Sequence, residues 1–414
     1  MQNLAVMNKR KLHIVFCTSE PETANRMLKS IDEELSNHTL SVAALFIGQD
    51  SMVDLSRFCL PVSCIDTYKG YPSIAESRNI CQEYLQKAMR DSDGLGLVLD
   101  DDLCWVMQEA EFEMLCDQLL SKGCDMAFSA LSGDAPVPKE YTRASPILDV
   151  LIEVYNSGSS PAVRKIMDFM KDVSVEGNVG SEINCHHDYY AYDKKSFYKA
   201  FVNIDLLNWD DFFNRLYVGK KTTRLISTPE KITLATGRER GGATLIFNPT
   251  VLDYSNQSIQ CGPFISRRSD MIMATSVKNS GYVIYNTPAV LSHNRSDSFD
   301  THDSRKLMGD ILGYALVESS NGGDYLAQLF ETHLSKRLLN TKVILEETST
   351  MLLLLRDWLR ERKRASPEIE ENIRNIILEN TKTYSDMKLL GVQEAMLVFK
   401  DFSNSNLFNM YEAG

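Results

Sequence analysis

The chain has 414 residues, of which 43% are hydrophobic and 24% are charged, a composition typical of globular proteins with two or three folding units. Its formal net charge of −12 disfavours broad nucleic-acid binding, because a phosphate backbone favours a basic surface. No run reaches the roughly 18 consecutive apolar residues of a membrane helix, and the first residues lack the order of a signal peptide, so we expect a soluble, cytoplasmic protein without a membrane span.

The cysteines point to a reducing compartment. Their number is odd, no two form a CxxC pair, and several lie within apolar runs, so we expect buried free thiols in preference to zinc ligands or disulfides. The nine are Cys17, Cys59, Cys64, Cys81, Cys104, Cys116, Cys124, Cys185 and Cys261.

The first third of the chain alternates between apolar runs and helical spacing. Continuous apolar runs predict buried strands, and apolar residues three or four apart predict helices. The strands are expected over residues 11–18, 41–48, 94–99 and 125–131, and the helices over 22–35, 73–90 and 110–120. Apolar strands that do not alternate with polar residues indicate an α/β fold with a mostly parallel sheet covered by helices.

The pattern is weaker between residues 132 and 240, where glycine, proline and serine cluster, and we interpret this region as an inserted subdomain. Two more strands are expected at 244–248 and 281–285, with a short helix at 270–278 between them. Beyond a polar stretch, helical spacing returns near Met351 and continues over 367–380 and 386–399. We therefore expect one domain over 10–300, which includes the insertion, and an all-helical C-terminal module over 305–414 whose helices offer a surface for homo-oligomer formation.

The segment Val98–Trp105 (VLDDDLCW) carries the strongest chemical signal. Three adjacent carboxylates repel one another when they are buried without a cation, and carboxylate oxygens suit hard ions such as Mg²⁺ or Mn²⁺. Ligands of open α/β sheets bind beyond the carboxyl ends of the strands, which is where Asp100, Asp101 and Asp102 fall. The alternative is a solvated acidic turn, and the buried strand that precedes these residues favours a site.

With these parts in order, the sequence resembles the GT-A glycosyltransferases, especially those of family 2. The resemblance lies in KLHIVFCTSE, SVAALFIG, AESRN and VLDDDL, which look like the family's first strand and nucleotide-binding turn, second strand, Ala-Arg-Asn-like helix and Asp-x-Asp motif. It implies a Rossmann-like sheet, with Asp100 on the nucleoside side of the donor and Asp102 on the metal. Either Asp101 or Asp102 is then the main ligand. The donor-binding residues that it implies are Thr18, Glu20, Arg78, Asp100, Asp101 and Arg267.

For Arg78 the resemblance implies a place near the donor diphosphate, and the alternative is a surface arginine paired with Glu76 or Glu83. Arg267 and Arg268 suit phosphate or an anionic acceptor, because a guanidinium matches phosphate geometry. Ordinary surface arginines are the alternative for both.

A second part of the resemblance lies downstream. Gly241 and Gly242 take the place of the family's glycine-rich strand beside the acceptor, and the insertion 132–240 would lie on the acceptor side. In SRRSDMIMATSVKNSGYVIYNTP, Asp270 takes the place of the general base and Gly281–Tyr282 that of a Gly-Tyr pair. The residue before Asp270 is serine where the family has an acid. The alternative role for Asp270 is an N-cap of the helix that follows.

His293 ends the apolar segment PAVLSH, where many GT-A enzymes place a histidine on the metal or diphosphate. Imidazole is an acceptable ligand for Mn²⁺, so the expected metal ligands are Asp100, Asp102 and His293, and a structural histidine is the alternative. The neighbouring His186 and His187 point to opposite faces if they lie on a strand, and we interpret them as acceptor-side or structural residues.

The resemblance implies a metal-dependent enzyme that moves a sugar from a UDP- or GDP-linked donor to a hydroxyl acceptor of unknown identity. A nucleotidyltransferase of similar fold is one rival, although the turn CTSEPETANR carries Glu20 and Glu22 where such enzymes usually have glycine and basic residues. A non-catalytic binding or scaffold protein is the other rival.

Overall fold

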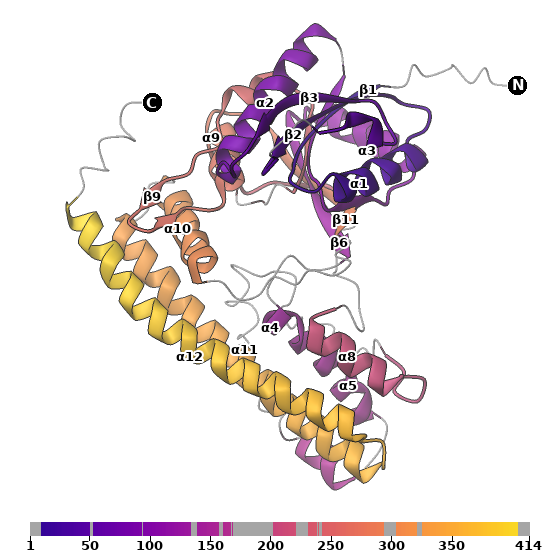
Figure 1. Cartoon of the computed structure of the whole chain (residues 1–414), viewed down its shortest axis with the longest axis vertical. Coiled ribbons are helices and arrows are strands. Elements are labelled where there is room, and N and C mark those ends of the chain that lie inside the picture. Colours follow the sequence, from indigo (N-terminus) through magenta and orange to yellow (C-terminus); the bar gives the residue numbers. More distant parts are fainter. Residues whose placement is uncertain are drawn as a thin grey trace, which may run out of the picture.

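The structure of the chain is a computed structural model. It describes residues 10–49, 53–92, 94–133, 139–156, 160–166, 168, 202–220, 231–237, 239, 242–293, 304–320 and 325–404. An α/β region forms one end of the molecule, and a long helical hairpin runs away from it (Figure 1).

The centre of the α/β region is a sheet, nine-stranded among the described residues, in the order β3-β2-β1-β4-β8-β6-β11-β5, with β7 paired to β11. Its strands are β1 (Lys11–Thr18), β2 (Thr39–Ile47), β3 (Val62–Tyr68), β4 (Leu95–Asp100), β5 (Leu103–Trp105), β6 (Met126–Gly133), β7 (Thr233–Leu234), β8 (Ala243–Ile246) and β11 (Ile284–His293). Strands β3, β2, β1 and β4 are mutually parallel, as are β6 and β11, whereas β8, β5 and β7 pair antiparallel. The predicted mostly parallel, helix-covered sheet is confirmed.

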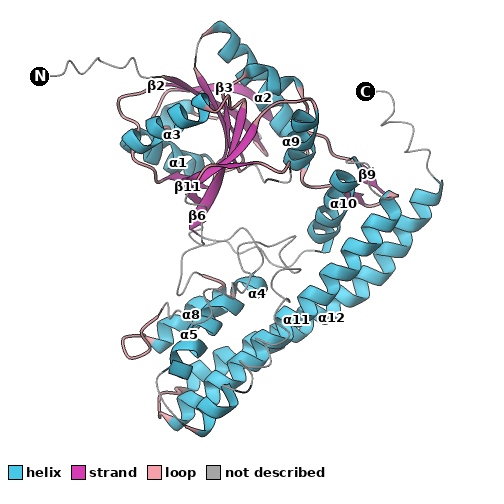
Figure 2. Ribbon diagram, turned by 180° about the vertical axis from the view of Figure 1, so that it is seen from behind, coloured by secondary structure: helices cyan, strands magenta, loops and turns pink. Residues whose placement is uncertain are grey.

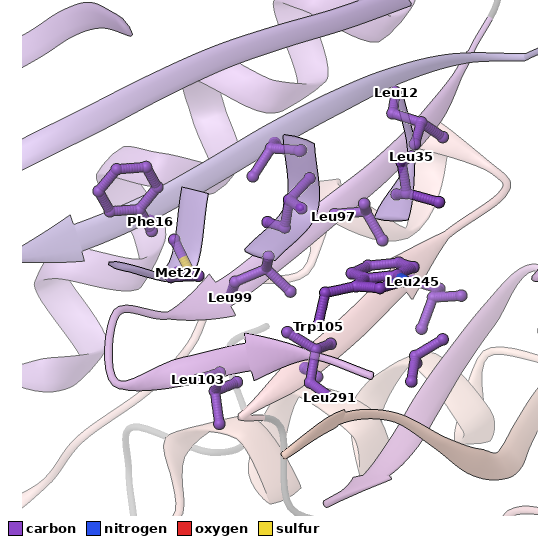
Figure 3. Packing of buried hydrophobic residues seen from close by; sticks show 14 of the residues in the cluster. Leu12, Phe16, Met27, Leu35, Leu97, Leu99, Leu103, Trp105, Leu245 and Leu291 are labelled. Carbon is purple, nitrogen blue, oxygen red and sulfur yellow. The ribbon is translucent and has the colours of Figure 1, made fainter. Parts of the chain in front are cut away.

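Helices cover both faces of this sheet. The side chains of Leu12, Ile14 and Phe16 point to the face that carries α1 (Pro21–Glu34) and α3 (Glu109–Ser121). Figure 3 shows part of this core, including the contact region of Leu97, Leu99, Trp105 and Leu245. Val15 points to the opposite face, where α2 (Ile74–Asp91) and α9 (Ser269–Asn279) pack. Both faces are thus buried, which explains why the strands read as continuous apolar runs.

The rest of the chain is mainly helical. Helix α10 (Ser304–Ser320) follows the sheet, and α11 (Leu326–Glu361) and α12 (Pro367–Asn404) form the long hairpin (Figure 2). Helices α4 (Lys139–Thr142), α5 (Ala144–Asn156) and α8 (Trp209–Val218), all from the predicted insertion, pack on this hairpin. A shared core joins them, with Ile147, Phe213, Leu352 and Trp358 among its buried members. A two-stranded ribbon, β9 (Gln260–Cys261) and β10 (Phe264–Ile265), and the 3-10 turns Leu55–Arg57 and Pro249–Asp253 complete the described elements.

Three details differ from the sequence prediction. The two helices expected over 367–380 and 386–399 are one continuous helix, α12, because the buried Asn380 and Thr383 extend its inner face across the expected break. Strand β11 begins at Ile284 and continues to His293, beyond the expected 281–285. Strands β3 and β5 were not predicted, because β3 has only one buried residue and β5 has only three residues in all.

The cysteines that the structure describes are free thiols. Four of them are buried, Cys81, Cys116, Cys124 and Cys261, while Cys59 and Cys64 are exposed. Cys185 lies outside the described residues. Within the described part of the chain, no helix is long and apolar enough to cross a membrane.

Candidate active site

The three adjacent aspartates lie where β4 ends, beside the end of β1. Asp100 is the last residue of β4 and pairs in register with Cys17 of β1, while Asp101 and Asp102 form the turn into β5. All three side chains are half-buried. The carboxyl ends of two parallel strands therefore meet at the carboxylates, as the sequence predicted for a ligand site in an open sheet.

Arg78 connects this turn to a distant part of the chain. Its Nη2 lies 3.3 Å from Asp100 Oδ1, and its Nη1 lies 3.4 Å from Asp270 Oδ2. Helix α2 presents Arg78 from its second turn and is capped by the Ser73 hydroxyl, which accepts a hydrogen bond from the Glu76 amide. One guanidinium thus bridges two carboxylates that lie 170 residues apart in sequence and that the family resemblance assigns to the same site.

The electrostatics of these groups follow from burial and from each other. Burial opposes the charge of Arg78, but the charges of Asp270 and Asp100 outweigh it and raise the pKa of the guanidinium. Burial, together with the nearby Asp102 and Asp270 charges, raises the pKa of Asp100 against the opposing effect of Arg78 and His293. Burial also raises the pKa of Asp101 to about 6, although a hydrogen bond with Thr18 acts in the other direction. A single arginine does not neutralise this group of acids, so an additional cation would be stabilised there.

Asp102 and His293 face each other because β5 pairs antiparallel with β11 and sets Leu103 opposite His293. His293 Nδ1 lies 3.3 Å from Asp102 Oδ2. The ring is buried, and among the described residues Nδ1 has no hydrogen-bond partner. A ring nitrogen and a carboxylate oxygen thus converge at this point.

This pair fits a small divalent cation. Bonds of about 2.1 Å at right angles place neighbouring ligand atoms roughly 3 Å apart, close to the observed separation. No group of three or more His, Cys, Asp or Glu side chains in the described part of the chain is arranged to hold a metal ion. A site built on one carboxylate and one imidazole would leave the remaining positions to water and phosphate, which is the usual way Mg²⁺ is held with substrate phosphates.

Gly242 lies against Asp100. Its carbonyl oxygen accepts a hydrogen bond of 2.9 Å from the Asp100 amide. A Cβ at this position would lie 3.0 Å from Asp100 Oδ2 and 2.9 Å from Leu131 Cδ1. A side chain at this position would therefore crowd Asp100 and Leu131, and the expected acceptor-side role of Gly242 stays a prediction. Gly241 lies outside the described residues.

Asp270 lies in the first turn of α9 and is buried. It is not the N-cap of that helix. The N-cap position belongs to Arg268, which has a left-handed backbone (φ 70°, ψ 32°) and makes no capping hydrogen bond with its side chain. The capping alternative for Asp270 is therefore wrong, and its carboxylate faces Arg78 instead. The expected Gly281–Tyr282 pair lies after α9, where Gly281 has a φ of 91° and Tyr282 packs edge-on against Tyr254.

The remaining expected donor residues divide into two groups. Thr18 lies at the end of β1, where its hydroxyl accepts a hydrogen bond from the Glu20 amide and also bonds Asp101. Glu20 is exposed, and its carboxylate accepts a hydrogen bond from Thr23. Arg267, by contrast, pairs with Asp310 of α10, with Nε 3.2 Å from Oδ1. Thr18 thus adjoins the aspartate turn, while Arg267 faces α10. His186 and His187 lie outside the described residues.

Two residues near the site have no signal in the sequence. Asn256, in the loop before β9, exchanges hydrogen bonds with Asn79, next to Arg78 on α2, and donates to Gln82 at 3.0 Å. Asp310 holds both Arg267 and Arg268, just before Asp270. A polar residue in a loop and an aspartate in a helical run give no local signal, because both acquire their role only from the tertiary contact.

Comparison with known proteins gave matches among solved structures alone. No family model matches the chain, and no curated protein matches it. Crystal structures of S. aureus TarS residues 1–349 align over 92% of this chain. The complex with UDP-GlcNAc has 11% identity, a TM-score of 0.36 and 92% coverage of its own chain, and the complex with UDP has 10% identity, a TM-score of 0.37 and 91% coverage. Identity and TM-score are too low to assign a function from this likeness.

Proposed function

We propose that this chain is a metal-dependent glycosyltransferase that moves a sugar from a nucleoside-diphosphate donor to a hydroxyl acceptor. One observation carries the proposal. Arg78 bridges Asp100 and Asp270, and Asp102 faces His293, so that residues far apart in sequence converge at the carboxyl end of β4. Such a group of acids, one arginine and one imidazole suits a diphosphate held through a cation.

Asp102 and His293 would hold Mn²⁺ or Mg²⁺, with Asp100 beside them. When bound, this ion would screen the two phosphates and offset the negative charge that develops on the departing nucleoside diphosphate. Imidazole favours Mn²⁺ over Mg²⁺ in this role. Thr18 and Asp101 would border the nucleotide, because they adjoin the same turn.

Asp270 is the proposed general base. Its carboxylate would accept the proton from the acceptor hydroxyl as that oxygen bonds to the anomeric carbon. The bond from the anomeric carbon to the diphosphate oxygen breaks at the same time, and its electron pair leaves with the nucleoside diphosphate. Arg78 holds Asp270 and Asp100 together, which would keep the base at a fixed distance from the donor end of the site. Attack from the side opposite the leaving group inverts the sugar configuration.

A nucleotidyltransferase would use a similar sheet and similar acids but would release pyrophosphate. The turn after β1 runs from Thr18 directly into α1 at Pro21 and contains no glycine. A loop that wraps a triphosphate with backbone amides is usually rich in glycine. This favours the sugar transferase.

Titration calorimetry with UDP and GDP tests the role of the metal. We expect the full-length protein to bind one of them in Mn²⁺ or Mg²⁺ and to lose this binding in EDTA. Asp102→Ala should abolish the dependence on metal, with a loss of affinity at least as large as the roughly 10- to 100-fold caused by removing outer partners of a metal site. Asp253→Ala is the matched control, because it removes an exposed carboxylate that pairs with Arg90 elsewhere.

Donor turnover separates the transferase from its rivals. A transferase that lacks its acceptor is expected to release free sugar slowly from one UDP- or GDP-sugar, and only when the metal is present. Equal nucleotide binding in EDTA, or pyrophosphate release from a nucleoside triphosphate, would contradict the proposal.

A further inference from the structure

The N-cap residue of α9, Arg268, has an unfavourable backbone conformation. Arg268 has a φ of 70°, and apart from Lys363 it is the only described non-glycine residue with a positive φ. Side-chain crowding disfavours this conformation for any L-residue with a Cβ, so it persists where surrounding contacts fix it. The carbonyl oxygen of Arg268 accepts hydrogen bonds from the Met271 and Ile272 amides at 3.0 and 3.1 Å, so its conformation sets the first turn of the helix.

Contacts from α10 fix this residue. Arg268 Nη2 donates a hydrogen bond of 2.9 Å to Asp310 Oδ2, and both side chains are mostly buried. The Arg268 guanidinium also lies over the ring of Tyr314, 5.7 Å from its centroid. Asp310 and Tyr314 are one turn apart on the same face of α10, so this face holds the guanidinium from two directions.

The backbone of α10 lies directly against the segment that leads to Arg268. A Cβ on Gly313 would lie 2.0 Å from the Arg267 carbonyl oxygen, and one on Gly309 would lie 2.5 Å from the Ile265 carbonyl oxygen. The Gly309 carbonyl oxygen also accepts a hydrogen bond of 2.9 Å from the Arg267 amide. Two glycines spaced by four residues thus let the helix approach closely enough for Asp310 to reach Arg268.

Asp270 lies two residues after Arg268, in the turn whose hydrogen bonds end on the Arg268 carbonyl. Its carboxylate meets Arg78 at 3.4 Å. A change in the Arg268 backbone would therefore rotate the first turn of α9 and move Asp270 relative to Arg78 and Asp100.

We infer that Asp310 is a positioning residue for the reaction. By holding Arg268 in the left-handed conformation, it fixes the start of α9 and with it the place of Asp270 opposite Arg78. This rests on the proposed function, in which Asp270 is the base. The helix that follows the sheet, α10, then acts on the reaction through Arg268 and the start of α9.

Hydrogen exchange measured by mass spectrometry on the full chain tests the positioning itself, without any assay of activity. Asp310→Ala should speed exchange in the first turn of α9 by about tenfold, the factor by which a left-handed backbone is disfavoured for a residue with a side chain. Adding Arg268→Gly to this variant should restore protection, because glycine adopts positive φ without that penalty. Asp310→Asn keeps the shape of the side chain, so its exchange rate should lie between those of the wild-type protein and Asp310→Ala. It replaces Asp310→Ala in the test if the alanine variant does not fold.

Steady-state kinetics with the donor and metal then tests the consequence. Asp310→Ala should lower kcat by about tenfold while the donor KM changes by less than about twofold, since Asp102 and His293 are not touched. Arg268→Gly in the same background should recover most of kcat. Asp253→Ala is the control in both experiments, because it removes an exposed carboxylate that pairs with Arg90 of α2 and not with α10.

The outcomes distinguish this inference from the proposed function. If α9 in Asp310→Ala exchanges at the wild-type rate, or if Arg268→Gly fails to restore protection, the positioning role is overturned. If exchange responds as expected but the wild-type protein turns over no nucleotide sugar, the proposed function fails and the positioning of Asp270 stands.

Discussion

The fit between Gly242 and Asp100 shows how closely single residues are constrained at this site. An added methyl group would contact Asp100 Oδ2 at 3.0 Å and Leu131 Cδ1 at 2.9 Å, so one of these side chains must move. Gly242→Ala should therefore weaken metal-dependent nucleotide binding by about tenfold and lower the free energy of unfolding by roughly 1–3 kcal/mol, the usual cost of overpacking. Calorimetry and urea unfolding measure the two effects.

Gly70→Ala is the matched control, because a Cβ on Gly70 would meet nothing within 4 Å. Both substitutions add the same methyl group and the same backbone restriction. If the two variants bind nucleotide equally well, the close approach of Gly242 to Asp100 has no part in binding.

The sequence pattern located the aspartates, and the family resemblance named Asp270 and His293 beside them. Asp100, Asp101 and Asp102 stand out because a buried strand precedes them, which is a local pattern. From the sequence, Arg78 had two possible environments, since its pairing with Asp270 joins segments that only the folded chain brings together. Asp310 was not identified, because its partners Arg267 and Arg268 lie in the segment just before α9, far from Asp310 in sequence.

At the scale of elements, the start of α2 matters because this helix carries Arg78. The Ser73 hydroxyl accepts a hydrogen bond of 3.1 Å from the Glu76 amide. Ser73→Ala should lower the free energy of unfolding by about 1 kcal/mol, because a helix-terminal amide loses its partner. Gln108 begins α3 without a side-chain capping bond, so Gln108→Ala should change stability by only a few tenths of a kcal/mol by the same principle. Equal shifts of the urea midpoint in Ser73→Ala and Gln108→Ala would rule out a capping role for Ser73.

The sequence predicted well the strands whose two faces are both buried and the helices that carry one regular apolar stripe. Strands β1, β2 and β4 are continuous apolar runs, and α1, α2 and α3 carry their apolar residues at helical spacing. Strand β5 is too short to show a period, yet its pairing with β11 is what brings Asp102 to His293. The strands that carry the aspartates were thus predictable, whereas the contact between Asp102 and His293 depends on an element without a sequence signal.

At the scale of the whole molecule, helices α4, α5 and α8 share a core with the hairpin of α11 and α12. Arg143, between α4 and α5, is fully buried. It donates hydrogen bonds to the Leu216 and Tyr217 carbonyl oxygens at the end of α8 and to Glu379 of α12 at 2.8 Å. Lys139 also reaches Glu379, at 2.9 Å. Sequence patterns cannot show that helices near residues 140 and 210 pack on one near 380, because each helix alone shows only that it has an apolar face.

Glu379 should therefore stabilise the assembly of these helices, and its effect should depend on pH. Burial alone would raise its pKa, but hydrogen bonds from Lys139 and Arg143 outweigh this and place the pKa below the ordinary value of 4.5. The unfolded chain then takes up a proton more readily than the folded one, so the stabilisation is complete above about pH 4.5 and is lost as the pH falls further. Glu379→Gln should cost roughly 2 kcal/mol at pH 7, less than for a fully buried pair because Glu379 is partly exposed.

Urea unfolding of wild-type protein and Glu379→Gln from pH 7 to pH 3 measures this difference, which should shrink as the pH falls. Glu371→Gln is the control on the same helix, because Glu371 pairs with Arg374 in an exposed i, i+3 contact of the kind that contributes only a few tenths of a kcal/mol. A loss in Glu379→Gln that stays constant down to pH 3 would mean that packing, and not the charge on Glu379, joins these helices. A loss of the same size in both variants would mean that α12 responds to any change of charge on its surface. Only a loss of stability that is confined to Glu379→Gln and shrinks as the pH falls matches a charged carboxylate that holds the buried Arg143 in place.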